Sequence, residues 1–214
     1  SCFQECKMLA KLDLGHLAKL ETIGEQFCKE CPFLTEVTLP ASLTAMGDFC
    51  FQECQVLAKL DLGGLTKLET VGVQFCMRCP RLAEVTLPNS VRTIDHSCFR
   101  GSRLVKVDLS NLTKLETIGE QFCMDCPLLA DVVLPASVTD IGPRTFLRCA
   151  ALAKIDLQHL TSLKSLHGAF CQECPLLTEV VLPASVTDIG TNAFRNCAAL
   201  AKIDLQHLTS LKSL

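Results

Sequence analysis

One short pattern, a leucine followed three and five residues later by further aliphatic residues, recurs along almost the whole chain. The leucines that open its nine copies are Leu9, Leu34, Leu57, Leu82, Leu104, Leu129, Leu152, Leu177 and Leu200. The steps between them are 25, 23, 25, 22, 25, 23, 25 and 23 residues. A fixed period in this range is typical of a solenoid. Each copy predicts a short strand whose successive side chains point alternately inward and outward. Such a strand buries its apolar face only when neighbouring copies stack on it.

Two kinds of unit alternate along the chain. Residues 152–170 exemplify type A, and residues 177–194 exemplify type B. Type B carries the run Leu-Pro-Ala-Ser-Val-Thr-Asp-Ile-Gly, which stands at residues 134–142 and again at 182–190. This run resembles the BspA-like leucine-rich repeat family, and the resemblance covers the whole chain. Type A departs from the family pattern, because a second leucine-rich run replaces the Pro-Ala-Ser segment.

The resemblance implies a fold and a general role. The implied fold is an α/β repeat solenoid, a right-handed leucine-rich-repeat coil with a parallel concave sheet and short convex turns or helices. The implied role is that of a cell-surface or secreted protein that binds protein partners or mediates adhesion. The source organism and the identity of any partner do not follow from it.

The length, the ends and the charge of the chain bear on its domain organisation and on the classes of partner it can bind. The chain has 214 residues, and because a repeat array grows by addition we expect one domain over residues 1–214. It starts and ends in mid-repeat, which predicts a piece of a longer array with uncapped edges near Leu9 and Leu200 that favour edge-mediated self-association. A net charge of −3 gives no general attraction to nucleic acid, and no apolar run reaches the ~20 residues of a membrane span.

One phenylalanine recurs in each unit, five to seven residues before an opening leucine. The nine are Phe3, Phe27, Phe51, Phe75, Phe99, Phe122, Phe146, Phe170 and Phe194. Stacking predicts that they form one buried column, with a short helical turn around each. Glycines that precede them suit a tight bend out of the core; these are Gly24, Gly72, Gly119, Gly142 and Gly190.

The chain has 15 cysteines, and eight of them form Cys-x-x-Cys pairs. The pairs are Cys28/Cys31, Cys76/Cys79, Cys123/Cys126 and Cys171/Cys174. Such spacing suits a zinc site or a redox dithiol. However, pairs two units apart lie ~10 Å from each other, so they cannot share one zinc ion. The second cysteine of each pair also occupies a core position, so we favour structural thiols, with no metal and no cofactor, and expect the first cysteine to be the more exposed.

The third position of each strand carries a charge whose sign alternates without exception. The residues are Lys11, Glu36, Lys59, Glu84, Lys106, Asp131, Lys154, Glu179 and Lys202, and Asp61, Asp108 and Asp156 lie beside them. Parallel stacking predicts that Lys106 lies between Glu84 and Asp131, close enough to pair with both. Opposite charges on adjacent strands fix the register, and the same residues form a candidate polar binding strip on the concave face. His16, His159 and His207 share one position after the strand, which we interpret as a solvated edge.

These observations favour a non-enzymatic protein-interaction scaffold, which binds through the faces of the solenoid. Two alternatives stay open. The Cys-x-x-Cys pairs suggest a metal-binding or thiol-redox protein, and the identity of residues 149–166 with residues 197–214 suggests a structural spacer or a scaffold built from a consensus. Free cysteines indicate a reducing compartment, whereas the family resemblance indicates a surface or secreted location.

Overall fold

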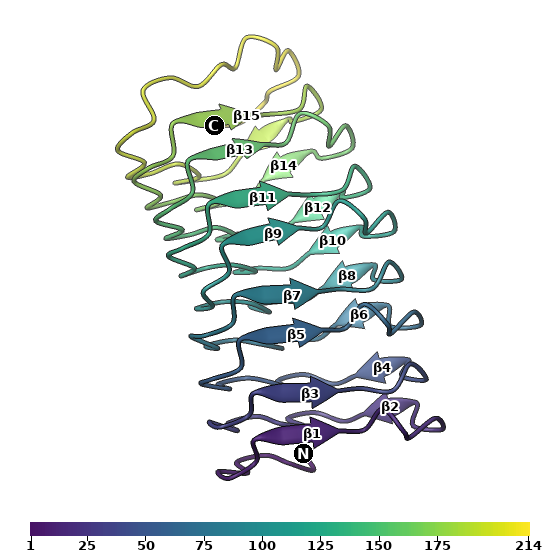
Figure 1. The fold of residues 1–214 in the computed structure, drawn as a ribbon. Coiled ribbons are helices and arrows are strands. Elements are labelled where there is room, and N and C mark those ends of the chain that lie inside the picture. Colours follow the sequence, from purple (N-terminus) through teal and green to yellow (C-terminus); the bar gives the residue numbers. More distant parts are fainter.

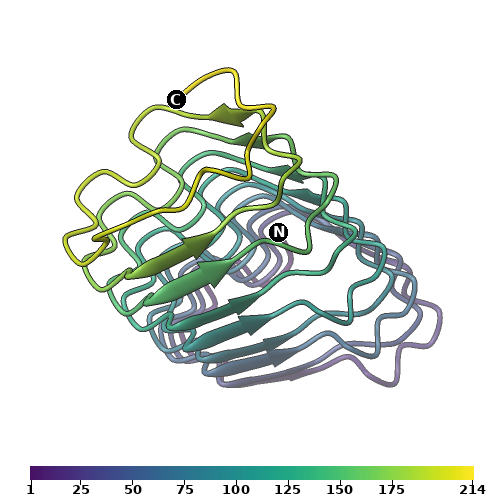
Figure 2. The ribbon, with the colours of Figure 1, turned by 90° about the horizontal axis from the view of Figure 1, so that it is seen from above.

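The computed structural model describes all residues from Ser1 to Leu214 and shows a parallel β-solenoid without helices (Figure 1). Each coil contributes a three-residue long strand and a two-residue short strand. The long strands are β1 (Lys11–Asp13), β3 (Glu36–Thr38), β5 (Lys59–Asp61), β7 (Glu84–Thr86), β9 (Lys106–Asp108), β11 (Asp131–Val133), β13 (Lys154–Asp156) and β15 (Glu179–Val181). The short strands are β2 (Thr22–Ile23), β4 (Ala45–Met46), β6 (Thr70–Val71), β8 (Thr93–Ile94), β10 (Thr117–Ile118), β12 (Asp140–Ile141), β14 (Ser165–Leu166) and β16 (Asp188–Ile189). The two kinds of strand lie on different sides of the coil (Figure 2).

The long strands pair two by two instead of forming the single nine-stranded sheet predicted from the sequence. The parallel pairs are β1–β3, β5–β7, β9–β11 and β13–β15, so each joins a type A unit to the type B unit that follows it. No backbone hydrogen bond links β3 to β5, β7 to β9 or β11 to β13. We call these type B to type A steps open junctions, and they are visible as the wider gaps between ribbons in Figure 1. The ninth unit, around Lys202, has no long strand.

Among the short strands only the β8–β10 pair crosses an open junction, and the turns bond across the others: Phe51 N donates to Phe75 O at 2.8 Å, and Phe146 N donates to Phe170 O at 2.9 Å. Strands β6, β8, β10 and β12 form one continuous four-stranded parallel sheet, and β2–β4 and β14–β16 form two further pairs. Thr93 is in register with Thr70 on one side and with Thr117 on the other. The sequence analysis did not predict this second sheet.

The segments around the phenylalanines form turns rather than the helical turns expected. Their amides bond to the neighbouring unit: Cys28 N donates to Cys50 O at 2.7 Å, and Glu30 N donates to Gln52 O at 2.8 Å. Gln26 and Glu30 also have left-handed backbones, with φ of 57° and 56°. Such residues cannot continue a right-handed helix, and the bonds between units replace the i to i−4 bonds of a helix.

The phenylalanine column lies in the core, as predicted for its middle members. Seven of the nine rings are buried, whereas Phe3 and Phe194 at the two ends are half-buried. Six neighbouring pairs pack edge to face, with ring centroids 5.3–6.5 Å apart. This geometry adds about 0.5–1.5 kcal/mol per pair beyond the burial of apolar area.

Candidate interaction surface

The alternating charges of the long strands form ion pairs only within the hydrogen-bonded strand pairs. The Nζ to carboxylate distances are 2.7 Å for Lys11–Glu36, 2.8 Å for Lys59–Glu84, 3.2 Å for Lys106–Asp131 and 2.9 Å for Lys154–Glu179. Each of these side chains is half or more exposed, so each pair contributes about 0–1 kcal/mol. The surface that carries them, which we call the long-strand face, is therefore largely self-neutralised.

The contacts of Lys106 correct the prediction that it pairs with the acids on both neighbouring strands. Its Nζ lies 3.2 Å from Asp131 and 3.2 Å from Asp108 on its own strand. These two carboxylates raise the pKa of Lys106, Asp131 having the larger effect. The predicted ion pair with Glu84 is absent, because Glu84 lies across an open junction and pairs with Lys59 instead.

The aspartates beside the lysines shape the turn at the end of each type A strand. In each, Oδ1 accepts a hydrogen bond from the backbone N–H two residues later, as Asp156 does from Gln158 at 3.1 Å. The other members are Asp13, Asp61, Asp108 and Asp204. Among the five, only Asp108 also forms an ion pair with a lysine. The carboxylates of the other four form no ion pair, and only Oδ1 of each accepts the hydrogen bond of the turn.

Two histidines bridge open junctions. His159 Nε2 lies 2.7 Å from the carbonyl oxygen of Leu134, and His207 Nε2 lies 2.8 Å from that of Leu182. Both rings belong to exposed residues, in agreement with the interpretation as a solvated edge. The contacts to the preceding unit were not predicted; they occupy strand-end carbonyls in a region where the long strands do not bond each other.

Clefts open on the long-strand face at the open junctions. One of about 320 Å³ lies between β11 and β13, lined by Asp131, Val133, Lys154, Asp156 and His159 among others. A larger one of about 930 Å³ lies between β15 and the last unit, lined by the matching Glu179, Val181, Lys202, Asp204 and His207 among others. A third, near the ends of β7 and β9, includes Thr86 and Asn111. The clefts thus recur with the two-unit repeat.

The first cysteines of the Cys-x-x-Cys pairs are buried, and the prediction that they are exposed is wrong. Cys28, Cys76, Cys123 and Cys171 have no exposed surface. The left-handed residues beside each phenylalanine break simple alternation, so two consecutive side chains such as Phe122 and Cys123 both enter the core. Burial raises the pKa of the Cys123 thiol well above its usual range, which keeps it protonated and unreactive.

The second cysteines of the pairs are buried as well, and their thiols bond one unit to the next. Cys79 Sγ donates to the carbonyl oxygen of Phe51 in a preceding unit at 3.0 Å. The equivalent bonds are formed by Cys31, Cys126 and Cys174. Ser102 takes this place in another unit, and its hydroxyl lies 3.3 Å from Cys126 Sγ. A small side chain that donates a hydrogen bond is what the position requires.

The alternative in which Cys76 and Cys79 are ligands of a metal ion disagrees with this arrangement. The Cys79 thiol has no exposed surface and is engaged by the Phe51 carbonyl, and the other three pairs lie in the same core environment. No group of three or more His, Cys, Asp or Glu side chains converges with the geometry of a metal site. All 15 cysteines are free thiols, so none of the pairs forms a disulfide in this structure. The contacts of Cys79 are those of a structural thiol.

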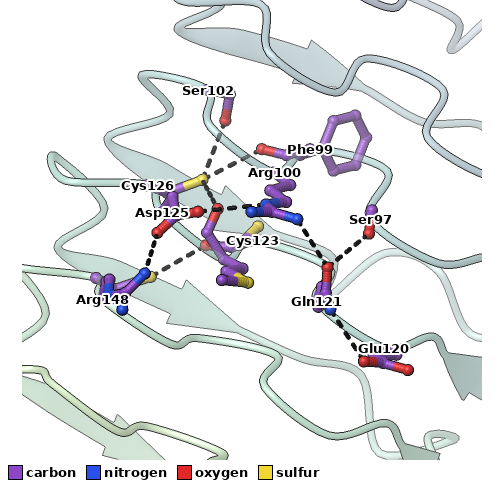
Figure 3. Close-up of polar contacts among 12 residues, drawn as sticks. Ser97, Phe99, Arg100, Ser102, Glu120, Gln121, Cys123, Asp125, Cys126 and Arg148 are labelled. Carbon is purple, nitrogen blue, oxygen red and sulfur yellow. Dashed lines mark hydrogen bonds and ion pairs between the residues drawn. The ribbon is translucent and has the colours of Figure 1, made fainter.

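A second row of charges, which sequence reasoning missed, follows the turns. Arg100 and Arg148 both contact the carboxylate of Asp125, at 3.2 and 3.6 Å (Figure 3). Arg148 also bonds Glu173 at 2.8 Å, which lowers the pKa of that carboxyl. The sequence did contain a signal for the turn position that Asp125 and Arg148 occupy. Gly101 and Asn196 stand at the equivalent position in other units, and both residue types favour the left-handed backbone found there. The row neutralises itself and joins adjacent units.

Comparisons with known proteins agree with this architecture. A family model described as "BspA type Leucine rich repeat region" matches residues 1–128 and 69–201, with six copies. None of the curated proteins matches the chain. The structure contains no helix with the length and hydropathy of a membrane-spanning segment.

Three solved structures are similar to this one. A leucine-rich repeat protein from T. pallidum has 24% identity and a TM-score of 0.64, over 96% of this chain and 85% of that chain. One from Eubacterium ventriosum has 18% identity and a TM-score of 0.56, over 94% of this chain and 46% of that chain. The pneumococcal vaccine antigen PcpA has 14% identity and a TM-score of 0.53, over 89% of this chain and 60% of that chain. At these identities the likeness shows the fold alone.

Proposed function

Because this chain belongs to the BspA-type leucine-rich repeat family, we propose that it is a non-enzymatic scaffold that binds a protein partner through its long-strand face. The observation that carries the proposal is the exposed row of strands, with repeated charges and a cleft at successive open junctions. The charged side chains pair along the row instead of converging on one point. Repetition of the same chemistry over a long surface suits an extended partner better than a small substrate.

We propose a surface or secreted location for the protein. The family supports this location, and one similar solved structure is a pneumococcal vaccine antigen. The free thiols do not oppose it: Cys2 is exposed, Cys6 and Cys197 are partly exposed, and all the others are buried. Thiols that oxidants do not reach have no need of a reducing compartment.

Blocking the long-strand face should weaken partner binding. Thr38 and Thr86 are exposed on β3 and β7, so the double variant Thr38→Arg and Thr86→Arg adds two bulky charges without disturbing the core. Binding would be measured by surface plasmon resonance against a panel of purified host and bacterial surface proteins. We expect the variant to lose at least about tenfold in affinity for any protein that the wild type binds, which corresponds to ~1.4 kcal/mol.

The matched control places the same two charges elsewhere. Ala150 and Ala198 are exposed at the corner before the long strands, and Ala150→Arg with Ala198→Arg should leave binding unchanged. Equal losses in both variants would contradict the proposed face, and absence of any binding would favour a structural spacer. Light scattering of the free wild type separates self-association through the edges near Leu9 and Leu200 from partner binding.

A further inference from the structure

We propose that two open-junction clefts in the C-terminal half bind two basic side chains, three residues apart, of a partner segment in the polyproline II conformation. The clefts are those between β11 and β13 and between β15 and the last unit. This inference rests on the proposed function and names the class of partner.

The two clefts present the same residues in the same places. Val133 and Val181 supply an apolar wall, Asp156 and Asp204 supply a carboxylate, and His159 and His207 lie at the rim. A lysine or arginine side chain fits this combination, because its aliphatic stem packs on the valine while its charged end reaches the carboxylate. The corresponding positions in the N-terminal half hold Thr38 and Thr86 in place of valine.

The carboxylates are available to a cation from outside. In Asp156, Oδ1 accepts the Gln158 N–H, and neither oxygen forms an ion pair with a lysine of the chain. Lys154, the nearest lysine in sequence, is engaged by Glu179 on the next strand at 2.9 Å. The lining of the β11/β13 cleft carries the carboxylates of Asp131 and Asp156 and one ammonium group, that of Lys154, so its net charge is negative and complements a basic side chain.

The spacing of the clefts selects the conformation of the partner. They are two units apart, which is at least ~10 Å at the strand separation of a parallel sheet, because one of the two steps is an open junction. A polyproline II segment repeats every three residues with a rise of ~3.1 Å each, so every third side chain points the same way at intervals of ~9.3 Å. An extended β-strand does not meet this requirement, because its third residue points to the opposite face.

The polar groups of the long-strand face also suit such a segment. Polyproline II has no internal hydrogen bonds, so its carbonyl oxygens are free to accept from outside. The ammonium group of Lys154 has three N–H donors, and Glu179 Oε1 accepts from it at 2.9 Å, which leaves donors for a peptide carbonyl. The segment would lie along the solenoid axis, across the strands.

Synthetic peptides test the spacing directly. Fluorescein-labelled (Pro-Pro-Arg)4 places its arginines on one face, whereas (Pro-Pro-Pro-Arg)4 has the same charge but rotates successive arginines around the helix. We expect fluorescence anisotropy at low salt to show at least about tenfold tighter binding of the first peptide. Equal affinities would mean that only net charge is recognised and would overturn the proposal. Tighter binding of an alanine-based helical peptide with arginines seven residues apart would overturn it as well.

Matched variants test the site. Asn in place of Asp keeps the oxygen that accepts the turn hydrogen bond but removes the charge, so the fold is retained. Asp156→Asn with Asp204→Asn should weaken (Pro-Pro-Arg)4 binding about fivefold or more, whereas Asp13→Asn with Asp61→Asn should change it less than about twofold. Equal losses would contradict the assignment to the C-terminal clefts. If the peptide does not bind at all while the Thr38→Arg and Thr86→Arg variant still loses its protein partner, this inference fails and the proposed function stands.

Discussion

Replacing Phe122 by alanine should destabilise the chain by about 3–5 kcal/mol. The ring has no exposed surface and packs edge to face between Phe99 and Phe146, at centroid distances of 5.5 and 6.5 Å. Its removal leaves a cavity between two stacked units, and each unit of a solenoid contacts only its neighbours. We therefore expect both a lower urea midpoint and a less cooperative transition, as the two halves begin to unfold separately.

Phe33 provides the control for this experiment. It is 57% exposed and lies outside the column, so Phe33→Ala should change the stability by less than about 0.5 kcal/mol. A loss below about 1 kcal/mol in Phe122→Ala would show that the aromatic column is not the core of the fold.

Replacing Gly142 by alanine should cost about 3 kcal/mol, near the upper end for an overpacked interior. A Cβ atom at this position would lie 2.5 Å from the backbone nitrogen of Glu120 and 2.8 Å from the carbonyl carbon of Gly119. Both atoms belong to the backbone of the neighbouring unit, so only a shift of one unit away from the other relieves the contact. Thermal unfolding monitored by circular dichroism would measure the loss.

Gly24 occupies the same place in the first unit, where a Cβ atom would meet nothing within 4 Å. Gly24→Ala should therefore be neutral or stabilise the chain by up to about 1 kcal/mol, since alanine restricts the unfolded state. If both alanine variants behave alike, close approach of the units does not explain these glycines.

The solenoid and its core could be predicted because the leucines and phenylalanines repeat at nearly constant steps. Periodic burial needs periodic apolar residues, and Phe51, Phe75 and Phe122 are fully buried as their spacing indicates. The turns were harder to predict. The glycines suggested tight bends, yet none of those preceding the phenylalanines has a positive φ; the structure requires glycine at residues 119, 142 and 190 because the backbones of adjacent units approach closely there.

The pairing of long strands in twos was not predicted from the sequence, although the paired units open 25 residues apart and the units on either side of an open junction open 22 or 23 residues apart. Lys106 is followed and preceded by acids at equivalent positions, so the charge pattern alone makes both neighbours equal. The path of the backbone between Glu84 and Lys106 determines which neighbouring strand forms hydrogen bonds with β9. The clefts, the histidine bridges and the free carboxylate of Asp156 all follow from that path, and for this reason they emerge only in three dimensions.

The open junctions are the central claim, because the clefts and the proposed partner depend on them. Lys154 allows the most direct test, since Glu179 lies in its own strand pair and Asp131 lies across the junction between β11 and β13. Double-mutant cycles at low salt would measure the coupling free energy of Lys154 to each acid. We expect about 0.3–1 kcal/mol with Glu179 and no measurable coupling with Asp131. Equal coupling to both acids would show a continuous sheet and contradict the account.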